Sequence, residues 1–142
     1  MQKYVMTANT KVVCGATLTQ IQRISSGLLG GWIEKESNLS QDGTCFVYDN
    51  ARVYGDAVVF GNARVFGNAL VFDNARVSGD AWVFGDALVY DNAWVYDNAW
   101  VYGDAEVYGD AWVYDNAVVS QQMTIQFGIV ITDLSKDKKG IL

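Results

Sequence analysis

The sequence contains no proline and no histidine, and only two cysteines among its 142 residues. Without proline there is no polyproline II linker. Without histidine the usual general base and the commonest metal ligand are both missing. The two cysteines, Cys14 and Cys45, are too few for a disulfide scaffold. We therefore expect a cytoplasmic protein with reduced thiols, no metal and no cofactor.

Long apolar runs and an excess of positive charge are also missing. No apolar segment reaches the roughly 18–20 residues that cross a bilayer, and residues 1–5 lack the apolar centre of a signal peptide. The formal net charge of −6 argues against binding to nucleic-acid phosphates or to anionic membrane surfaces. We therefore expect neither a membrane nor a direct nucleic-acid partner. Because 51% of the residues are hydrophobic, one domain with a packed core is expected.

A six-residue repeat dominates what is present. Alanine recurs at every sixth position from Ala51 to Ala117, and valine follows two positions later from Val53 to Val119, twelve times each. Within a repeat, the pattern Ala-x-Val-aromatic has the period of a strand, so alanine and valine lie on one face. The other two residues are Gly-Asp, Gly-Asn or Asp-Asn, the composition of a tight turn. Strands alternating with turns predict a β-solenoid.

Each turn is expected to need one residue that tolerates a positive φ angle. Glycine or asparagine is present in every turn from 49–50 to 115–116, and wherever aspartate comes first, asparagine follows. Glycine and asparagine adopt positive φ at low cost. The pattern therefore assigns this conformation to glycine or asparagine, and in the Asp-Asn turns to the asparagine.

The repeats resemble those of the hexapeptide-repeat proteins, in which a small residue follows four positions after an inward aliphatic one, as Ala57 follows Val53. The resemblance covers residues ~43–131 and implies an all-β fold, a left-handed parallel β-helix of triangular cross-section with about five coils. This chain departs from the family by carrying Tyr or Phe directly after the aliphatic residue. We expect an N-terminal β cap over 1–28, the β-helix over 29–132 and a C-terminal tail over 133–142.

A second resemblance lies in residues 29–40, LGGWIEKESNLS, which lead directly into the repeats. This entry segment is similar to that of the YdcK-type group of predicted hexapeptide transferases from bacteria and prophages. The transferase label of that group comes from its fold, so the resemblance indicates a phage or prophage context more than a reaction. Within the segment, Gly30 and Gly31 are expected to form a turn before the solenoid.

Outward side chains are expected to stack in columns, because 18 residues make one coil. The first aromatic face carries Phe46, Tyr48, Phe66, Trp82, Phe84, Trp100 and Tyr102, and the second carries Trp94, Tyr96, Trp112 and Tyr114. Such ladders stabilise neighbouring strands, but contiguous apolar surface also indicates an interface. Hexapeptide-repeat proteins are typically trimers that pack face to face, so the resemblance implies a homo-oligomer, with a homotrimer favoured and the first aromatic face as its contact.

A column of acidic residues follows one corner of the solenoid: Asp56, Asp73, Asp91 and Asp110. Aspartate is common in turns for its local hydrogen bonds and keeps surfaces soluble, so a solvated edge is one interpretation. Mimicry of nucleic acid is the other, because acids recur about every 2 Å along the rod, near the ~1.7 Å per charge of duplex DNA. A Ca²⁺ site is disfavoured, since the turns lack closely spaced carboxylates.

The chemistry of the hexapeptide acyltransferases carries over only in part. Those enzymes typically use a histidine base with an acyl-CoA or acyl carrier protein donor, and this chain has no histidine. Glu106, the only glutamate in the regular repeats, is the candidate base, with an ordinary surface glutamate as the alternative. Cys45 occupies an inward alanine position and is expected to be a buried, inert thiol.

These observations favour a non-enzymatic, protein-binding or scaffolding β-solenoid without catalytic residues, which oligomerises or binds a partner protein through its aromatic ladders. Two alternatives stay open: a hexapeptide-class acyltransferase using acyl-CoA, and an acidic DNA-mimic inhibitor.

Overall fold

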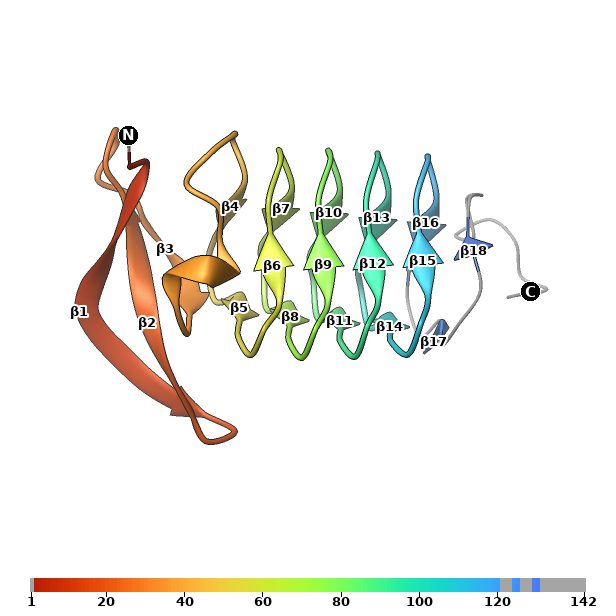
Figure 1. The fold of residues 1–142 in the computed structure, drawn as a ribbon, viewed down its shortest axis with the longest axis horizontal. Coiled ribbons are helices and arrows are strands. Elements are labelled where there is room, and N and C mark those ends of the chain that lie inside the picture. The colour runs from red at the N-terminus through yellow and green to blue at the C-terminus, as the bar shows by residue number, and fades with distance from the viewer. Residues whose placement is uncertain (1, 121–123, 126–128, 131–142) are drawn as a thin grey trace.

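The computed structural model describes residues 2–120, 124–125 and 129–130, which form a rod of stacked coils closed at one end by a β-hairpin (Figure 1). Apart from one turn of 3₁₀ helix, the regular elements are all strands, and the expected all-β parallel solenoid is confirmed. The tail expected over 133–142 lies outside the described residues. Within the part that is described, no helix is long and apolar enough to cross a membrane.

Each six-residue repeat contributes one strand of two residues. The strands are β4 (Phe46–Val47), β5 (Arg52–Val53), β6 (Val58–Val59), β7 (Arg64–Val65), β8 (Leu70–Val71), β9 (Arg76–Val77), β10 (Trp82–Val83), β11 (Leu88–Val89), β12 (Trp94–Val95), β13 (Trp100–Val101), β14 (Glu106–Val107), β15 (Trp112–Val113), β16 (Val118–Val119), β17 (Thr124–Ile125) and β18 (Ile129–Val130). Every third strand pairs in parallel, so that Trp82 lies between Arg64 and Trp100. The expected register of 18 residues per coil is therefore confirmed.

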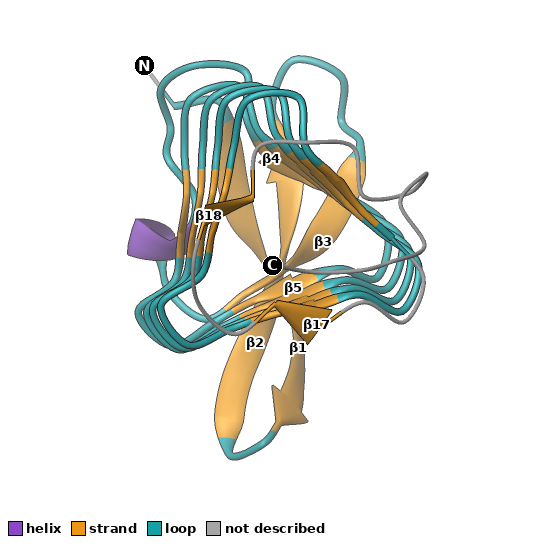
Figure 2. Cartoon of the chain, turned by 90° about the vertical axis from the view of Figure 1, so that its right-hand side faces the viewer, coloured by secondary structure: helices purple, strands orange, loops and turns teal. Residues whose placement is uncertain are grey.

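Three sheets surround the core when the rod is viewed along its axis (Figure 2). Sheet A has the order β1-β2-β3-β5-β8-β11-β14-β17, sheet B the order β18-β15-β12-β9-β6, and sheet C the order β16-β13-β10-β7-β4. The five stacked strands of sheets B and C correspond to the expected number of coils. The left-handedness of the solenoid stays a prediction.

The core consists of the repeated alanine and valine side chains. All twelve alanines from Ala51 to Ala117 and all twelve valines from Val53 to Val119 are completely buried, as the alternation predicts. Backbone amides bond from coil to coil, as between Trp82 N and Ala99 O at 3.0 Å. Burial of apolar side chains and pairing of backbone groups thus repeat with every coil. Burial of each valine contributes about 1.5–3 kcal/mol to stability relative to an exposed valine.

The turns differ from the expectation in one respect. The residue with positive φ is always the first of the two, and in the Asp-Asn turns this is the aspartate: Asp49, Asp73, Asp91, Asp97 and Asp115 have φ between 56° and 59°. The assignment to asparagine was therefore wrong. An aspartate in this conformation is less costly than most residues because its short carboxylate can accept a local hydrogen bond.

A β-hairpin covers the N-terminal end of the rod. Strand β1 (Tyr4–Val13) pairs antiparallel with β2 (Ala16–Arg23), and β2 pairs antiparallel with β3 (Leu29–Ile33). The turn of the hairpin is Cys14-Gly15, with φ of 50° and 81°, which suits a two-residue loop. Strand β3 then pairs in parallel with β5, so one sheet passes from the cap into the solenoid.

Gly30 and Gly31 lie inside β3, not in a turn, and the expectation of a turn was wrong. A Cβ atom on Gly31 would lie 2.6 Å from both the carbonyl oxygen of Ala51 and Cγ1 of Val47. On Gly30 it would lie 2.7 Å from the ring of Phe46 and from the carbonyl oxygen of Val47. The two glycines are therefore needed because the first coil packs directly against the backbone of β3.

Candidate interaction surfaces

The outward side chains of sheet C form the first candidate surface, which we call face C. It consists of Tyr48, Arg64, Phe66, Trp82, Phe84, Trp100 and Tyr102. The residues of this face lie in two rows, one on the strands themselves and one directly after them. Because strands of neighbouring coils are about 4.8 Å apart, equivalent rings in each row can lie flat on one another.

Both rows of face C are closely stacked. The Trp82 and Trp100 rings are 5.0 Å apart and inclined by 3°, while Phe84 stacks on Phe66 at 4.7 Å and on Tyr102 at 4.9 Å. The two rows meet edge to face, with Phe84 at 6.2 Å from Trp82 and 6.1 Å from Trp100. Offset and edge-to-face pairs add about 0.5–1.5 kcal/mol each to burial. The result is an aromatic surface fixed in position before any partner arrives.

Phe46 differs from the other residues expected on this face. Its side chain is completely buried. The guanidinium of Arg23 lies 4.4 Å from the centre of its ring, and Gly30 of β3 packs against the edge of the ring. Phe46 is therefore part of the junction between cap and solenoid and not of an exposed surface. The 18-residue register places it correctly in the column, but the cap, which has no repeat, covers it.

The second aromatic face, on sheet B, is less regular. Trp112 meets Trp94 edge-on, at 6.2 Å and 86°, and only Tyr96 and Tyr114 are stacked, at 5.1 Å. The row that contains Tyr96 and Tyr114 is interrupted one coil before Tyr96, where Ser78 takes the place of an aromatic residue. Trp112 is nevertheless 42% exposed, close to the 41% of Trp100 on face C. The two faces thus offer one exposed tryptophan each but differ in order.

A third ladder, on sheet A, is as well stacked as face C. Its rings are spaced 5.2 Å between Tyr54 and Phe72, 4.9 Å between Phe72 and Tyr90, and 5.0 Å between Tyr90 and Tyr108. Its strand positions carry Arg52, Leu70, Leu88 and Glu106 instead of tryptophan. Stacking alone therefore does not distinguish a binding face, because the ladder with aliphatic and charged neighbours stacks equally well.

Glu106, the candidate base, is part of this third ladder. The hydroxyl of Tyr90 donates a hydrogen bond to Oε1 of Glu106 at 3.0 Å. Burial, and next the hydrogen bond to Glu106, raise the pKa of Tyr90 to about 12. The Glu106 carboxylate thus accepts from a tyrosine of the stacked ladder, a contact that joins two neighbouring coils of sheet A.

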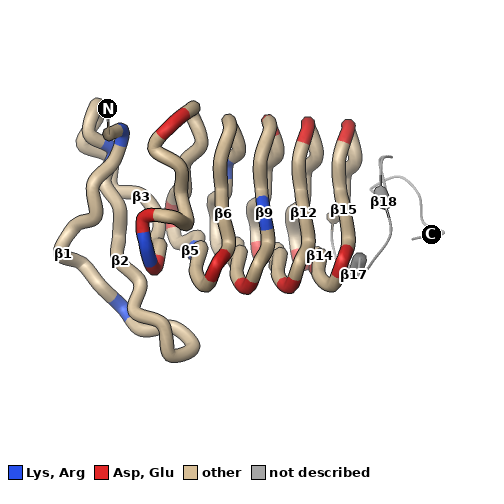
Figure 3. Tube along the Cα trace, viewed as in Figure 1, with Lys and Arg blue, Asp and Glu red and all other residues tan. Residues whose placement is uncertain are grey.

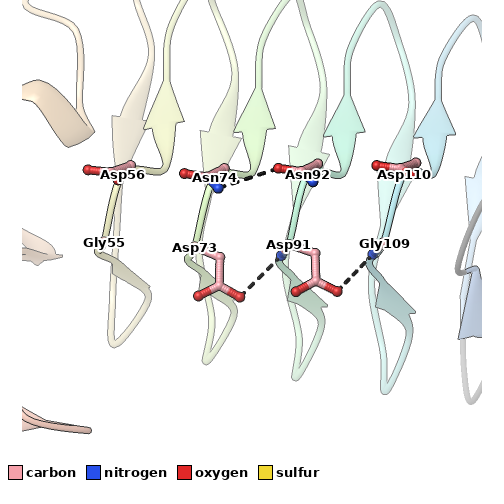
Figure 4. A pocket seen from close by; sticks show the side chains of 8 residues that line it. All are labelled: Gly55, Asp56, Asp73, Asn74, Asp91, Asn92, Gly109 and Asp110. Carbon is pink, nitrogen blue, oxygen red and sulfur yellow. Dashed lines mark hydrogen bonds between the residues drawn. The ribbon is translucent and has the colours of Figure 1, made fainter.

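The acidic column lies along one corner of the rod (Figure 3). The turns stack so that Asp56, Asn74, Asn92 and Asp110 form one row and Gly55, Asp73, Asp91 and Gly109 form the other, around an open hollow of about 490 Å³ (Figure 4). The four expected aspartates thus come together at one corner but in two different rows.

Two of these aspartates form hydrogen bonds to the next coil. Oδ2 of Asp73 accepts from the backbone N–H of Asp91 at 3.3 Å, and Oδ2 of Asp91 accepts from that of Gly109 at 3.1 Å. At other corners, Asp49 and Asp97 accept in the same way from residues 18 positions later. The carboxylate therefore satisfies a turn N–H that a glycine at the same position leaves without a side-chain acceptor.

The second half of the entry segment, residues 34–40, contacts the first turn of the acidic column. Lys35 forms an ion pair with Asp56 at 2.8 Å, and Oε1 of Glu34 accepts from Gly55 N at 2.8 Å. Asn38, completely buried in the 3₁₀ helix η1 (Glu36–Asn38), donates to the carbonyls of Gly55 and Ala57. The Lys35 hydrogen bond lowers the pKa of Asp56. These contacts hold residues 34–40 against the first coil of the solenoid.

Cys45 is completely buried, as expected, and its Sγ lies 3.2 Å from Nζ of Lys3. Cys14, which the sequence did not place, is exposed at the tip of the hairpin. Within residues 2–120, 124–125 and 129–130, no three His, Cys, Asp or Glu side chains are grouped so that they could hold a metal ion.

One pocket was missed by the sequence analysis. It has a volume of about 610 Å³, lies where the cap meets face C, and is lined by Gln2, Lys3, Arg23, Ile24, Ser25, Gly43, Thr44, Tyr48 and Arg64. Its residues come from the segment before β1, the end of β2 and the turn after it, the loop before β4, the residue after β4, and β7. No spacing in the sequence connects them, because they meet only through the single packing of cap on solenoid.

Comparison with protein families agrees with this geometry. Residues 46–61 and 87–103 match the family model described as YdcK Beta solenoid repeat. The chain contains YdcK-type β-solenoid repeats. Both matched stretches lie in the regular part of the rod, where each repeated alanine, and the valine two positions after it, is buried. No curated protein matches the chain.

Proposed function

We propose that this YdcK-type solenoid is a non-enzymatic binding or scaffolding protein that associates through face C. A second copy of the chain is the partner that we favour, with a homotrimer as the assembly, and a different partner protein is the alternative. The observation that carries the proposal is the two-row aromatic surface around Trp82 and Trp100, which leaves Trp100 41% exposed.

Order and composition support face C over the other two faces. Tryptophan and tyrosine are enriched in the energetic centres of protein interfaces, where rigid rings lose little entropy on binding. On face C two tryptophans and three further rings are mutually stacked, whereas on sheet B the tryptophans meet edge-on. On sheet A, Trp32 lies in β3 of the cap, and the solenoid strands β5, β8, β11 and β14 carry no tryptophan. Arg64, 5.5 Å from Trp82, adds a residue type that interfaces also favour.

The same reasoning weakens the two alternatives. An acyltransferase needs a base, and Oε1 of Glu106 already accepts a hydrogen bond from the Tyr90 hydroxyl. A DNA mimic presents its carboxylates to a basic partner, whereas Oδ2 of Asp49, Asp73 and Asp91 accepts a hydrogen bond from a turn amide of the next coil. A cytoplasmic location remains part of the proposal because both thiols are free. A phage or prophage origin remains part of it because of the resemblance of the entry segment.

The experiment is sedimentation velocity of the wild-type chain and of two matched variants, Trp100→Ala and Trp112→Ala. The two tryptophans have nearly equal exposure and equivalent places in their repeats but lie on different faces. We expect the wild type to sediment as an oligomer insensitive to salt, Trp100→Ala to dissociate, and Trp112→Ala to behave as wild type.

A wild-type chain that is monomeric at all concentrations excludes the homo-oligomer and leaves only a different partner protein. Equal loss in both variants, with unchanged thermal unfolding, would contradict the assignment to face C. Circular dichroism and thermal unfolding of each variant serve as the folding control, since a misfolded variant would lose its β signal.

A further inference from the structure

The pocket between the cap and face C concentrates positive charge in a protein that is otherwise acidic. Lys3, Arg23 and Arg64 are three of its lining residues, and none of the nine lining residues is an aspartate or glutamate. The formal net charge of the chain is −6. Three cations around one hollow repel one another unless an anion lies between them.

None of these three cations is neutralised by a carboxylate. Among residues 2–120 there is one ion pair, between Lys35 and Asp56, and neither residue lines this pocket. Asp49 lies close by, lining a neighbouring hollow together with Arg64, but its Oδ2 accepts from the backbone N–H of Gly67 at 3.1 Å. The lining of the pocket thus carries three positive charges and no negative one, with the carboxylate of Asp49 in the neighbouring hollow.

Two of the cations are fixed by their own contacts. Nζ of Lys3 lies 3.2 Å from the carbonyl oxygens of Asp42 and Gly43 and from Sγ of Cys45. Its three N–H groups are therefore engaged within the protein, and it supplies the pocket with charge and not with a hydrogen-bond donor. Arg23 donates from Nη2 to the Tyr48 hydroxyl at 2.9 Å and lies 4.4 Å above the ring of Phe46. A guanidinium has five N–H groups, so Arg23 keeps donors for a ligand after this one bond.

We infer that this pocket binds a small molecule that carries a phosphate monoester. A phosphate dianion provides three acceptor oxygens and close to two negative charges, which suits two arginines with N–H groups to donate beside the charge of Lys3. Ser25 supplies a hydroxyl in the lining, whereas the hydroxyl of Thr44 donates to Oδ1 of Asn62 at 2.8 Å. The volume of about 610 Å³ lies in the range of small-molecule sites and leaves room for the rest of the ligand against Ile24, which is 51% exposed.

Arg64 offers the sharpest test, because the chain contains a matched control. Arg64 and Arg76 are both exposed, occupy the same position in their repeats, and lie at the same 5.5 Å from a tryptophan ring, Trp82 and Trp94. Only Arg64 lines the pocket with Lys3 and Arg23. Replacing either arginine by glutamine therefore removes one charge and one cation–π contact, but only one replacement alters the pocket.

The experiment is isothermal titration calorimetry of the full chain with inorganic phosphate, glycerol 3-phosphate and, as a carboxylate, succinate. We expect both phosphates to bind, Arg64→Gln to weaken binding about tenfold, and Arg76→Gln to leave it unchanged. Amide chemical shifts in the presence of phosphate should change at Lys3, Arg23 and Thr44 and not at Arg76, which gives a readout independent of the variants.

Three results would overturn the inference: no binding of phosphate at about 10 mM, equal weakening by the two arginine variants, or succinate binding more tightly than phosphate. Tyr48 and Arg64 belong both to the pocket and to face C, so the sedimentation velocity of Arg64→Gln is measured beside its phosphate binding. A variant that assembles like the wild type but binds phosphate more weakly assigns the loss to the pocket. If no phosphate binds at all, the Trp100→Ala test of face C is unaffected.

Discussion

The N-terminal cap and the solenoid are built on opposite principles. In the solenoid the contacts of the core and of the turns recur, since each inward valine and each turn meets its equivalent 18 positions later. In the cap every contact occurs once, as between the Tyr4 hydroxyl and the carbonyl of Leu39 at 2.7 Å, or Arg23 and Tyr48. Substitutions should therefore have equal effects at equivalent solenoid positions and individual, larger effects at the cap.

The largest effect is expected at the junction of the two regions. Gly31→Ala places a Cβ 2.6 Å from the Ala51 carbonyl oxygen, and backbone cannot give way as a flexible side chain does. We expect a loss of about 3 kcal/mol or more in the free energy of unfolding, measured by urea denaturation. Leu29→Ala, at a 49% exposed position of the same strand, is the control and should cost less than about 1 kcal/mol. A Gly31→Ala protein as stable as the control would contradict the packing of β3 on the first coil.

Removal of one core valine should have a smaller effect that is the same on all three sheets. Val83→Ala, Val89→Ala and Val95→Ala, on sheets C, A and B, should each cost about 2 kcal/mol. Urea denaturation of the three variants checks this. Because coils contact only their neighbours, the three values should agree within about 0.5 kcal/mol. A spread of several kcal/mol would show that the coils are not equivalent.

Turn aspartates should contribute less than core valines. Asp91→Ala keeps a side chain at φ 59° and removes the acceptor for Gly109 N, so a loss of about 1–2 kcal/mol is expected. Asp91→Gly removes the same acceptor but relieves the backbone cost, and should lose about half as much. Thermal unfolding of both variants gives the comparison, and a glycine variant less stable than the alanine variant would refute the role assigned to φ.

Alkaline pH should have the smallest effect, absent near neutrality. Burial, followed by Cys14, raises the pKa of Tyr54 to about 12, and burial with Glu106 does so for Tyr90. Above a pH of about 10 the unfolded chain loses these protons first, so stability should fall as the pH rises from 10 towards 12. An ultraviolet titration of phenolate should show late-ionising tyrosines, with one fewer in Tyr90→Phe. Ionisation of every tyrosine near pH 10 would contradict the packing of the half-buried ladder on sheet A.

The sequence predicted the solenoid because repetition tests a pattern many times over. Inward alanine and valine, stacked turns and the columns of Trp82 with Trp100 all follow from an 18-residue coil. Phe46 shows the boundary of this reasoning: its column is right, but only the three-dimensional fold reveals that Arg23 and Gly30 cover it. The positive φ of Asp73 was missed because composition says which residues a turn holds, not which one takes the strain.

The candidate sites divide in the same way. The aromatic faces and the acidic column could be located from spacing alone, since their members are separated by whole coils. The pocket around Lys3, Arg23 and Arg64 could not, because its lining joins a hairpin strand, a loop and a solenoid strand that share no period. Which face is covered in solution is likewise not a matter of periodicity, because all three faces carry stacked rings.

The central claim is that face C is the interface. Hydroxyl-radical footprinting of the tryptophans tests it most directly, using the unmodified protein under conditions where it self-associates or binds its partner. Trp100 and Trp112 are 41% and 42% exposed in the single chain, so their oxidation rates should be nearly equal without a partner. If face C is the interface, oxidation of Trp100 will be slowed several-fold while that of Trp112 is unchanged. Equal rates in the assembly, or protection of Trp112 alone, would contradict the assignment of face C.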